Sequence, residues 1–163
     1  ENISFSRANA EKYVYIKTPY LILDRETNQA LINASLAGID IKIITPKIPD
    51  KKLVNACTKS FYGELLGAGI KIYEYEPGFI HSKNFVCDDE IGVVGTINLD
   101  YRSLYLHFEC GVLMYKTEAI KDIKEDFLNT LKKSKKISIE DTRKIKWADK
   151  FITAILRVFA PLM

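Results

Sequence analysis

Two pairs of polar residues in the middle of the chain have types and a spacing that could hold an anion and move a proton. His81 and Lys83 are two positions apart, so an extended segment would place both on one face, with a nucleophile or acid beside a cation. Thr96 and Asn98 repeat this spacing directly after Gly95. An ammonium, an amide and a hydroxyl that converge on one point can hold anionic oxygens.

These residues form one longer pattern, H-x-K, four residues, D, six residues, G-T-x-N, which runs from His81 to Asn98. The pattern resembles the HKD signature of the phospholipase D superfamily, with Asp88 as its carboxylate and Gly95 as its glycine. Six fixed residues at fixed spacing make a far more specific signal than a lone G-x-G-x-x-G.

Flanking segments narrow the resemblance to the C-terminal half of bacterial cardiolipin synthases. The segments that carry it are Thr18-Pro19-Tyr20, Asn98-Leu99-Asp100-Tyr101-Arg102-Ser103 and Phe108-Glu109. The resemblance extends from about Tyr13 to Phe159-Ala160-Pro161-Leu162. The chain departs from the family at His107, where an Asn is common, and at Cys110, while the matched motif positions are intact.

The resemblance implies a mechanism that needs two histidines from two motifs. One histidine attacks the phosphodiester phosphorus to form a phosphohistidine, and the other protonates the leaving alcohol and later deprotonates the incoming one. His81 belongs to a second motif and is expected to be the general acid and base, with the nucleophilic role as the alternative. Lys83 and Asn98 are expected to bind phosphate oxygens, with Thr96 as a further contact, without a metal or another cofactor. Glu109 matches the carboxylate that orients a motif histidine.

Other polar residues in this region have structural interpretations. Asp88 is five positions beyond Lys83, so alternation places it on the opposite face, where it would satisfy local backbone donors at a turn. His107 lies outside the motif and is expected to be a surface or otherwise satisfied histidine. Residues 100–103 have two interpretations: a structural turn in which Arg102 pairs with Asp100, and a role near the pocket, which the resemblance favours slightly.

The elements that must position these residues follow from apolar periodicity and turn residues. The first part alternates strand and helix: strand Tyr13–Ile16 continued at Leu21–Leu23, helix Thr27–Ala37, strand Ile41–Thr45, helix Lys51–Leu66 and strand Ile70–Tyr75. The second part has strands Ser82–Cys87, Gly92–Thr96 and Phe108–Tyr115, then helices Thr117–Leu131 and Ile145–Leu162. A hairpin turn is predicted at Asp88-Asp89-Glu90. The predicted class is α/β, a largely parallel or mixed sheet sandwiched by helices (α-β-α), as in a phospholipase D-like half-domain.

The composition fits one globular domain. The chain has 163 residues, of which 47% are hydrophobic and 28% charged, which excludes disordered and fibrous proteins. No stretch has the roughly 18 uninterrupted apolar residues of a membrane-spanning helix. Cys57, Cys87 and Cys110 form no C-x-x-C pair, so they predict neither a disulfide framework nor a zinc site and are expected in the core.

Positive charge is concentrated near the C-terminus. Residues 1–115 have 12 Lys and Arg against 14 Asp and Glu, whereas residues 116–163 have 12 against 7. The basic cluster consists of Lys132, Lys133, Lys135, Lys136, Arg143, Lys144 and Lys146. It is interpreted first as a solvated helix end and alternatively as a surface for phosphates. The apolar stripe of the helix predicted over Ile145–Leu162 favours core or subunit packing over a membrane interface.

The resemblance implies that residues 1–163 are a single phospholipase D-like domain, the second HKD half of a longer bacterial membrane protein. N-terminal membrane helices and the first HKD half would lie outside the chain, whose site would face the cytoplasm. The implied reaction joins two molecules of phosphatidylglycerol into cardiolipin and glycerol, with the missing half and an anionic phospholipid surface as partners. The soluble fragment alone is expected to be inactive.

Two alternatives stay open at this point. One is a single-motif phosphodiesterase or nuclease that completes its site as a homodimer and takes nucleic acid as a substrate. The other is a non-catalytic module that binds anionic lipid.

Overall fold

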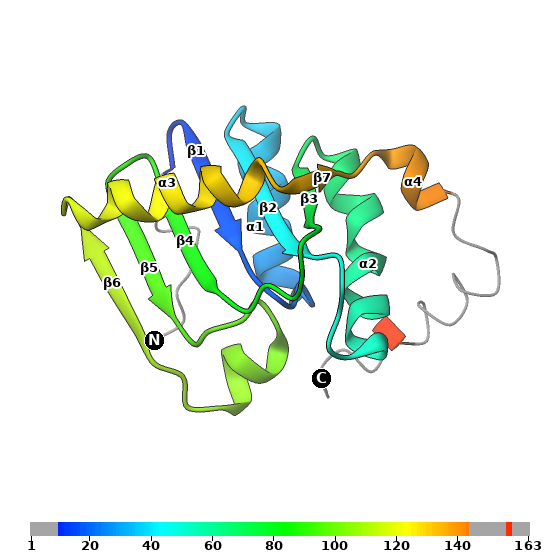
Figure 1. Ribbon diagram of the computed structural model, residues 1–163. Coiled ribbons are helices and arrows are strands. Elements are labelled where there is room, and N and C mark those ends of the chain that lie inside the picture. The colour runs from blue at the N-terminus through cyan, green and yellow to red at the C-terminus, as the bar shows by residue number, and fades with distance from the viewer. Residues whose placement is uncertain (1–9, 144–155, 158–163) are drawn as a thin grey trace.

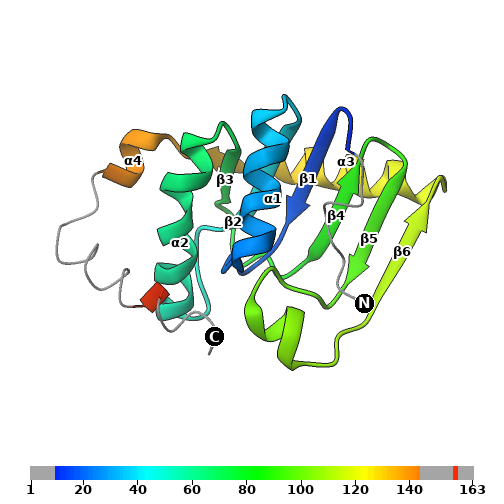
Figure 2. The same ribbon diagram turned by 180° about the vertical axis from the view of Figure 1, so that it is seen from behind.

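All five residues of the first strand, β1 (Tyr13–Lys17), are buried, so both faces of this strand must be covered. The computed structural model, which describes residues 10–143 and 156–157, covers them with helices on both sides of a seven-stranded sheet (Figures 1 and 2). None of the described helices is long and apolar enough to cross a bilayer.

The sheet has the strand order β6-β5-β4-β1-β2-β3-β7. The other strands are β2 (Asp40–Pro46), β3 (Lys71–Tyr75), β4 (Lys83–Cys87), β5 (Ile91–Gly95), β6 (Gly111–Tyr115) and β7 (Ser134–Lys136). The helical elements are α1 (Arg25–Leu36), α2 (Lys52–Gly67), the π-helical turn η1 (Arg102–Leu106), α3 (Ala119–Leu131) and α4 (Ile139–Arg143).

Side chains that alternate along β1 divide the core into two layers. Val14 and Ile16 belong to a cluster with residues of α1 and α2 on one face of the sheet. Tyr13 and Tyr15 belong to a second cluster under α3, where the rings of Tyr15 and Phe127 stack with centroids 4.9 Å apart. The period of two in the strand therefore matches the three-layer α-β-α arrangement.

The predicted α/β class is confirmed, and the sheet is mixed. Among the seven strands, parallel pairing is confined to β1 with β2 and β2 with β3, and the remaining strand pairs are antiparallel. The reason lies in the connections, since a helix joins each parallel pair, whereas β4, β5 and β6 follow one another without a helix long enough to return the chain.

The predicted strands and helices up to residue 131 are present with shifts at their ends. The last predicted strand is shorter than expected and starts at Gly111, because the chain first forms η1. Leu21 forms only an isolated bridge to Leu99. Sequence patterns missed both η1 and β7. The exposed Lys135 and Lys136 of the basic cluster lie on β7, so at these two residues the expected helix end is wrong.

Three further expectations have clear outcomes. The hairpin turn between β4 and β5 is confirmed, with positive φ angles of 53° at Asp88 and 60° at Asp89. Cys57 and Cys87 are buried and free as expected, whereas Cys110 is exposed, because it lies in the connection before β6. The helix predicted over 145–162 falls outside the described residues apart from 156–157, and so do residues 144 and 146 of the basic cluster.

Candidate functional site

The motif residues other than Asp88 lie at one end of the sheet, where β4 begins, β5 ends and β6 begins. The antiparallel register pairs Lys83 with Gly95 and Gly95 with Gly111. The connection from β5 to β6, which contains η1, lies at the lower edge in Figure 1. Hairpin pairing brings the Lys83 ammonium close enough to interact with the Glu109 carboxylate, 26 positions away in the sequence (109 − 83).

His81 and Lys83 are in direct contact, as their spacing predicts. The Lys83 Nζ lies 2.9 Å from Nε2 and 3.1 Å from Nδ1 of His81. The His81 side chain is exposed, and the ring of Phe79 lies 5.6 Å from its ring, centroid to centroid. The exposed His81 imidazole is therefore in direct contact with the Lys83 ammonium group.

The Lys83 side chain is buried, with 8% of its surface exposed. This burial lowers the pKa of the Lys83 ammonium below its ordinary value, while the carboxylates of Glu109 and Asp100 oppose part of the shift. A cation that is poorly solvated in the free protein gains more from an incoming anion than a solvent-exposed lysine does. Lys83 is therefore well suited to hold a phosphate oxygen.

Thr96 joins the end of β5 to the start of β6. Its hydroxyl donates a hydrogen bond to Oε2 of Glu109, and it accepts one of 3.0 Å from the backbone N–H of Cys110. The Thr96 N–H donates to the Cys110 carbonyl oxygen at 2.9 Å. Among the described residues, the hydrogen-bond partner of the Glu109 carboxylate is thus Thr96, and no contact between Glu109 and His81 is present.

Gly95 is required by the close approach of these two strands. A Cβ at this position would lie 2.3 Å from the Cys110 carbonyl oxygen and 2.6 Å from the Gly111 Cα. Both obstacles are backbone atoms, which cannot rotate away as a side chain would. The motif glycine is therefore the residue that lets Thr96 reach Cys110 and Glu109.

Asn98, an expected phosphate contact, lies in a buried polar group with Asp100 and Ser103. Its Nδ2 donates to Oγ of Ser103 at 3.1 Å, while its Oδ1 is buried and has no hydrogen-bond partner. The Ser103 N–H donates to Asp100 Oδ1 at 2.7 Å. Burial and the nearby Glu109 raise the pKa of Asp100, against the hydrogen bonds from Ser103 and Asn98. The N-x-D-x-x-S spacing was the available signal for Asp100 and Ser103.

Asp88 lies at the far end of β4, away from the other motif residues, as alternation and spacing predict. Its carboxylate accepts the backbone N–H groups of Glu11, Lys12 and Tyr13 at 2.6, 3.0 and 2.7 Å. Burial alone favours the neutral acid, but these three donors hold the pKa of Asp88 below its usual range. The donors differ from those expected at the turn: they belong to the segment that leads into β1, because β4 pairs with β1.

The second histidine lies apart from the first. His107 is exposed at the end of η1. Its Nε2 accepts a hydrogen bond from Nε of Arg102, and its backbone N–H donates to the Arg102 carbonyl oxygen at 2.9 Å. The expected pair of Arg102 with Asp100 is wrong, because the turn is π-helical and Asp100 instead accepts from Ser103. The expectation of a satisfied surface histidine is confirmed.

Together the site offers an imidazole, a buried ammonium, a hydroxyl held by a carboxylate, and an amide. This set can bind a phosphodiester and move a proton, and it contains one motif histidine. Within the described residues, no group of three or more His, Cys, Asp or Glu could hold a metal ion.

Comparison with known proteins identifies the family. Residues 7–131 match the family described as "Cardiolipin synthase, PLD-like domain". An uncharacterized protein of Streptococcus mutans is 51% identical over 164 residues, which is 100% of this chain and 36% of that protein. Cardiolipin synthase 2 of Bacillus anthracis is 39% identical over 156 residues, 96% of this chain and 30% of that protein. The chain thus spans about a third of the length of these curated relatives.

Solved structures with low sequence identity share the fold. The phosphatidylserine synthase of Haemophilus influenzae superposes with a TM-score of 0.71 at 17% identity, over 94% of this chain and 41% of that one. Nuc of Salmonella typhimurium, a phospholipase D family member, superposes with a TM-score of 0.68 at 14% identity, over 80% of this chain and 84% of that one. With the match over residues 7–131, the chain belongs to the family of phospholipase D-like domains of cardiolipin synthases.

Proposed function

We propose that this chain supplies one half of an active site that transfers a phosphatidyl group from one phosphatidylglycerol to another, giving cardiolipin and glycerol. The observation that carries the proposal is the contact of the exposed His81 imidazole with the buried Lys83 ammonium. Family membership supports phospholipid chemistry, and the chain's share of its relatives' length leaves ample room for the other half of the site.

In the first step, a histidine supplied by the other half attacks the phosphorus of the donor phosphatidylglycerol. A P–N bond forms and the P–O bond to glycerol breaks, while His81 donates a proton to the departing glycerol oxygen. In the second step, His81 takes the proton from the terminal hydroxyl of the acceptor phosphatidylglycerol. The acceptor oxygen then bonds to phosphorus, and the P–N bond breaks.

The other polar groups of the site stabilise negative charge and orient the reacting groups during both steps. Lys83 and the Asn98 amide bind non-bridging phosphate oxygens, and Thr96 is a further contact, which stabilises the charge of the pentacoordinate transition state. Glu109 has its Oε2 engaged by Thr96, so its Oε1 is the atom available to orient a motif histidine. This division of roles uses side chains of this chain together with the histidine of the other half, and it calls on no cofactor.

The proposed partners follow from the same chemistry. They are phosphatidylglycerol, the N-terminal half that holds the first HKD motif, and the anionic membrane surface at which both substrates lie. The complete protein would be held at the bacterial membrane with this site on its cytoplasmic side.

The experiment compares two matched variants, since the chain has two exposed histidines, of which only one belongs to the motif. The chain, alone and co-purified with an N-terminal half, is incubated with phosphatidylglycerol vesicles, and cardiolipin and glycerol are measured. We expect product only with both halves, loss of at least 1,000-fold in His81→Ala, and near wild-type turnover in His107→Ala.

Other outcomes point elsewhere. Cardiolipin formed by His81→Ala at the wild-type rate would refute the assigned role of His81. Turnover of a phosphodiester or of DNA by the chain alone would indicate a site completed by a homodimer. Lipid binding without turnover in either arm, unchanged in His81→Ala, would indicate a non-catalytic module.

A further inference from the structure

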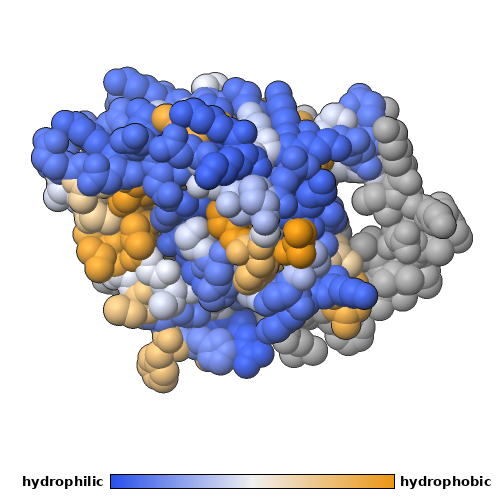
Figure 3. Space-filling view, viewed as in Figure 1, coloured by the Kyte–Doolittle hydropathy of each residue, from blue (hydrophilic) through white to orange (hydrophobic). Residues whose placement is uncertain are grey.

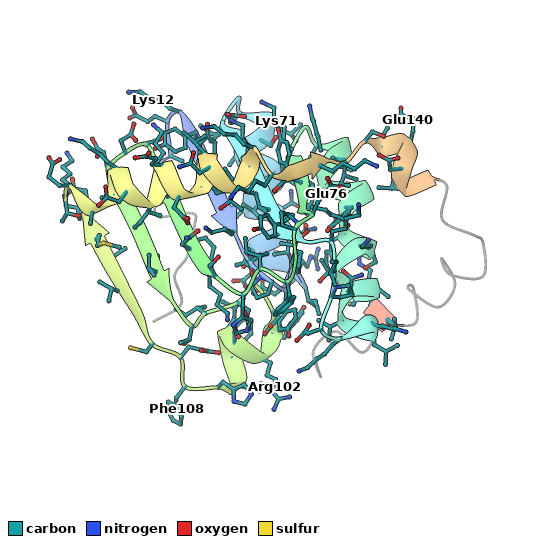
Figure 4. All side chains as sticks on the ribbon, viewed as in Figure 1. Lys12, Lys71, Glu76, Arg102, Phe108 and Glu140 are labelled. Atoms are coloured by element: carbon teal, nitrogen blue, oxygen red, sulfur yellow. The ribbon has the colours of Figure 1, made fainter. Side chains whose placement is uncertain are left out.

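Tyr20 and Asp50 form a hydrogen-bonded pair that the proposed reaction leaves without a role. The Tyr20 hydroxyl donates to Oδ2 of Asp50. Tyr20 lies between β1 and α1, and Asp50 lies between β2 and α2. β1 is parallel to β2 and antiparallel to β4, so β1 and β2 both end where β4 begins. The pair therefore lies at the same end of the sheet as His81 and Lys83, the lower edge in Figure 4, at which Arg102 is labelled.

Tyr20 is a direct neighbour of Asn98, the expected phosphate contact. An isolated parallel bridge joins Leu21 to Leu99, so the residues before them, Tyr20 and Asn98, lie side by side. The Ile22 N–H donates to the Leu99 carbonyl oxygen at 2.7 Å, which fixes this register. Neighbouring extended segments lie about 4.7–4.9 Å apart. Leu21 and Leu99 are fully buried, and alternation turns Tyr20 and Asn98 to the other side.

The backbone at Tyr20 is held in place before any substrate arrives. The hydroxyl of the fully buried Thr18 donates to the Tyr20 carbonyl oxygen at 2.8 Å and accepts from the Leu99 N–H at 3.4 Å. Pro19, between them, has a fixed φ. A side chain on such a backbone binds a ligand at a lower cost in conformational entropy than one on a free loop.

The pair offers hydrogen-bond acceptors together with a negative charge. Burial and the hydrogen bond to Asp50 raise the pKa of the Tyr20 phenol, and the charge of Asp100 adds to the rise, so the phenol keeps its proton and donates it to Asp50. The Asp50 side chain is exposed, and no hydrogen bond among the described residues uses its Oδ1. Oδ1 and the phenol oxygen accept from a hydroxyl, whereas a phosphate, which is an acceptor and an anion, is repelled.

The surroundings of the pair favour a neutral, polar occupant. Figure 3 shows mainly hydrophilic side chains along the lower edge of the molecule, whereas an apolar area lies higher, below α3 and over β5 and β6. Lys51 and Lys52 are exposed next to Asp50, and the Lys51 Nζ lies 5.9 Å from the centroid of the Tyr20 ring. These cations offset the charge of Asp50, so a second ammonium gains little there, while a hydroxyl donates without adding a charge.

The dimensions fit a glycerol group whose phosphate lies at Asn98. A three-carbon head group extends about 5 Å beyond its phosphate, since each carbon–carbon bond is about 1.5 Å long. This length matches the spacing of about 4.7–4.9 Å between the segments of Asn98 and Tyr20.

We propose that Tyr20 and Asp50 bind the two hydroxyls of the glycerol head group of the donor phosphatidylglycerol, and so select lipids with polyol head groups. This inference rests on the proposed function and deepens it, since it assigns the choice of head group to two residues outside the motif. The Asp50 Oδ1 accepts from one hydroxyl, and the Tyr20 oxygen accepts from the other. The phosphate itself stays with Lys83 and Asn98.

The test compares lipids that differ in the head group alone. Short-chain phosphatidylglycerol, phosphatidylpropanol, which keeps the three carbons without the hydroxyls, and phosphatidylethanolamine are used below the concentration at which they form micelles. Binding is measured by calorimetry, and head-group release by the first turnover, with the N-terminal half present. The proteins are wild type, Asp50→Ala, Tyr20→Phe and the matched control Tyr105→Phe.

The control loses a hydroxyl that is also bonded to an aspartate. Tyr105 donates to Oδ2 of Asp24, but the other oxygen of Asp24 accepts the Thr27 N–H, so this pair leaves no carboxylate oxygen for a ligand. Far-UV circular dichroism checks that each variant is folded. The measured quantity is the ratio of affinities for two lipids, which a general loss of structure would not change, because it weakens the binding of both.

We expect wild type to bind phosphatidylglycerol about tenfold or more tightly than phosphatidylpropanol. Asp50→Ala should reduce this preference to about threefold or less, Tyr20→Phe should lower it about threefold, and Tyr105→Phe should keep it. The proposal is overturned if wild type has no such preference, if Asp50→Ala keeps it, or if phosphatidylethanolamine binds as tightly as phosphatidylglycerol. Absence of binding to all three lipids would overturn it as well.

The two proposals fail in different ways. A preference for phosphatidylglycerol that depends on Asp50, with no glycerol or cardiolipin released by any protein, would refute the proposed reaction and support the head-group site. Cardiolipin synthesis by wild type, with a preference that is the same in Asp50→Ala and Tyr20→Phe, would do the reverse.

Discussion

Replacing Gly95 with alanine should separate β5 from β6 at the candidate site. The added Cβ would lie 2.3 Å from the Cys110 carbonyl oxygen, whereas Cβ atoms essentially never approach closer than 3.0 Å. The strands must therefore part by about 0.7 Å. The hydrogen bond from the Thr96 N–H to that carbonyl, now 2.9 Å long, would stretch to about 3.6 Å, beyond the range of a hydrogen bond.

The energetic cost follows from these shifts. A lost hydrogen bond costs about 1 kcal/mol, and strain from overpacking costs about 1–3 kcal/mol. The free energy of unfolding should therefore fall by about 2–4 kcal/mol. Urea unfolding followed by far-UV circular dichroism should show this as a midpoint lower by about 1–2 M.

Gly78→Ala is the matched control, because a Cβ at Gly78 would meet nothing within 4 Å. Its free energy of unfolding should stay within about 1 kcal/mol of wild type. If Gly95→Ala and Gly78→Ala unfold within about 0.5 kcal/mol of each other, the reasoning from backbone contact at Gly95 is wrong.

Two further predictions concern Asp88 and Ser103, polar residues outside this contact. The fold lowers the pKa of Asp88, so this carboxylate contributes stability above its unfolded pKa of about 3.9 and loses that contribution as the pH falls through its lower folded pKa. Asp88→Asn should lower the free energy of unfolding at pH 7 by about 1–3 kcal/mol, and the difference from wild type should shrink below about pH 4. The exposed Glu125→Gln, in the middle of α3, should change neither. Urea unfolding between pH 3 and 7 measures both, and a pH-independent difference would contradict the assignment. Ser103→Ala removes the acceptor of the Asn98 amide, so cardiolipin synthesis by the complete protein should slow about tenfold, with conservative rescue by Ser103→Thr; an unchanged rate would show that Ser103 does not position Asn98.

Burial of Lys83 also bears on the proposed chemistry. Moving an ammonium out of water costs free energy unless an opposite charge compensates it. Here the carboxylates of Glu109 and Asp100 act on the ammonium, yet the pKa of Lys83 stays lowered by its burial. A bound phosphodiester would supply the missing compensation, so part of its binding energy comes from charge that the free protein solvates poorly.

Local sequence patterns predicted most of the fold because side-chain alternation and turn-forming residues strongly determine where strands and helices lie. Side chains of β1 point alternately to the two faces of the sheet, so this apolar strand required cover on both faces. Glycines that end helices, such as Gly38 with φ of 99°, marked the ends of elements. The same patterns missed β7, since its lysines resemble a solvated surface and its strand pairing depends on β3 being nearby. They also missed η1, because a π-helical turn has no distinct sequence period.

The sequence by itself determined which chemistry is available and where the motif residues stand in the chain. The i, i+2 spacing alone placed His81 beside Lys83, because alternation in an extended segment is a local property of the backbone. Only the tertiary structure decided the features that depend on strand pairing. These are the burial of Lys83, the hydrogen bond from Thr96 to Glu109, and the hydrogen bonds that Asp88 accepts from the backbone at the start of β1. These contacts join residues 13 to 77 positions apart, and their geometry is set by hairpin register and close backbone approach, which no local pattern encodes.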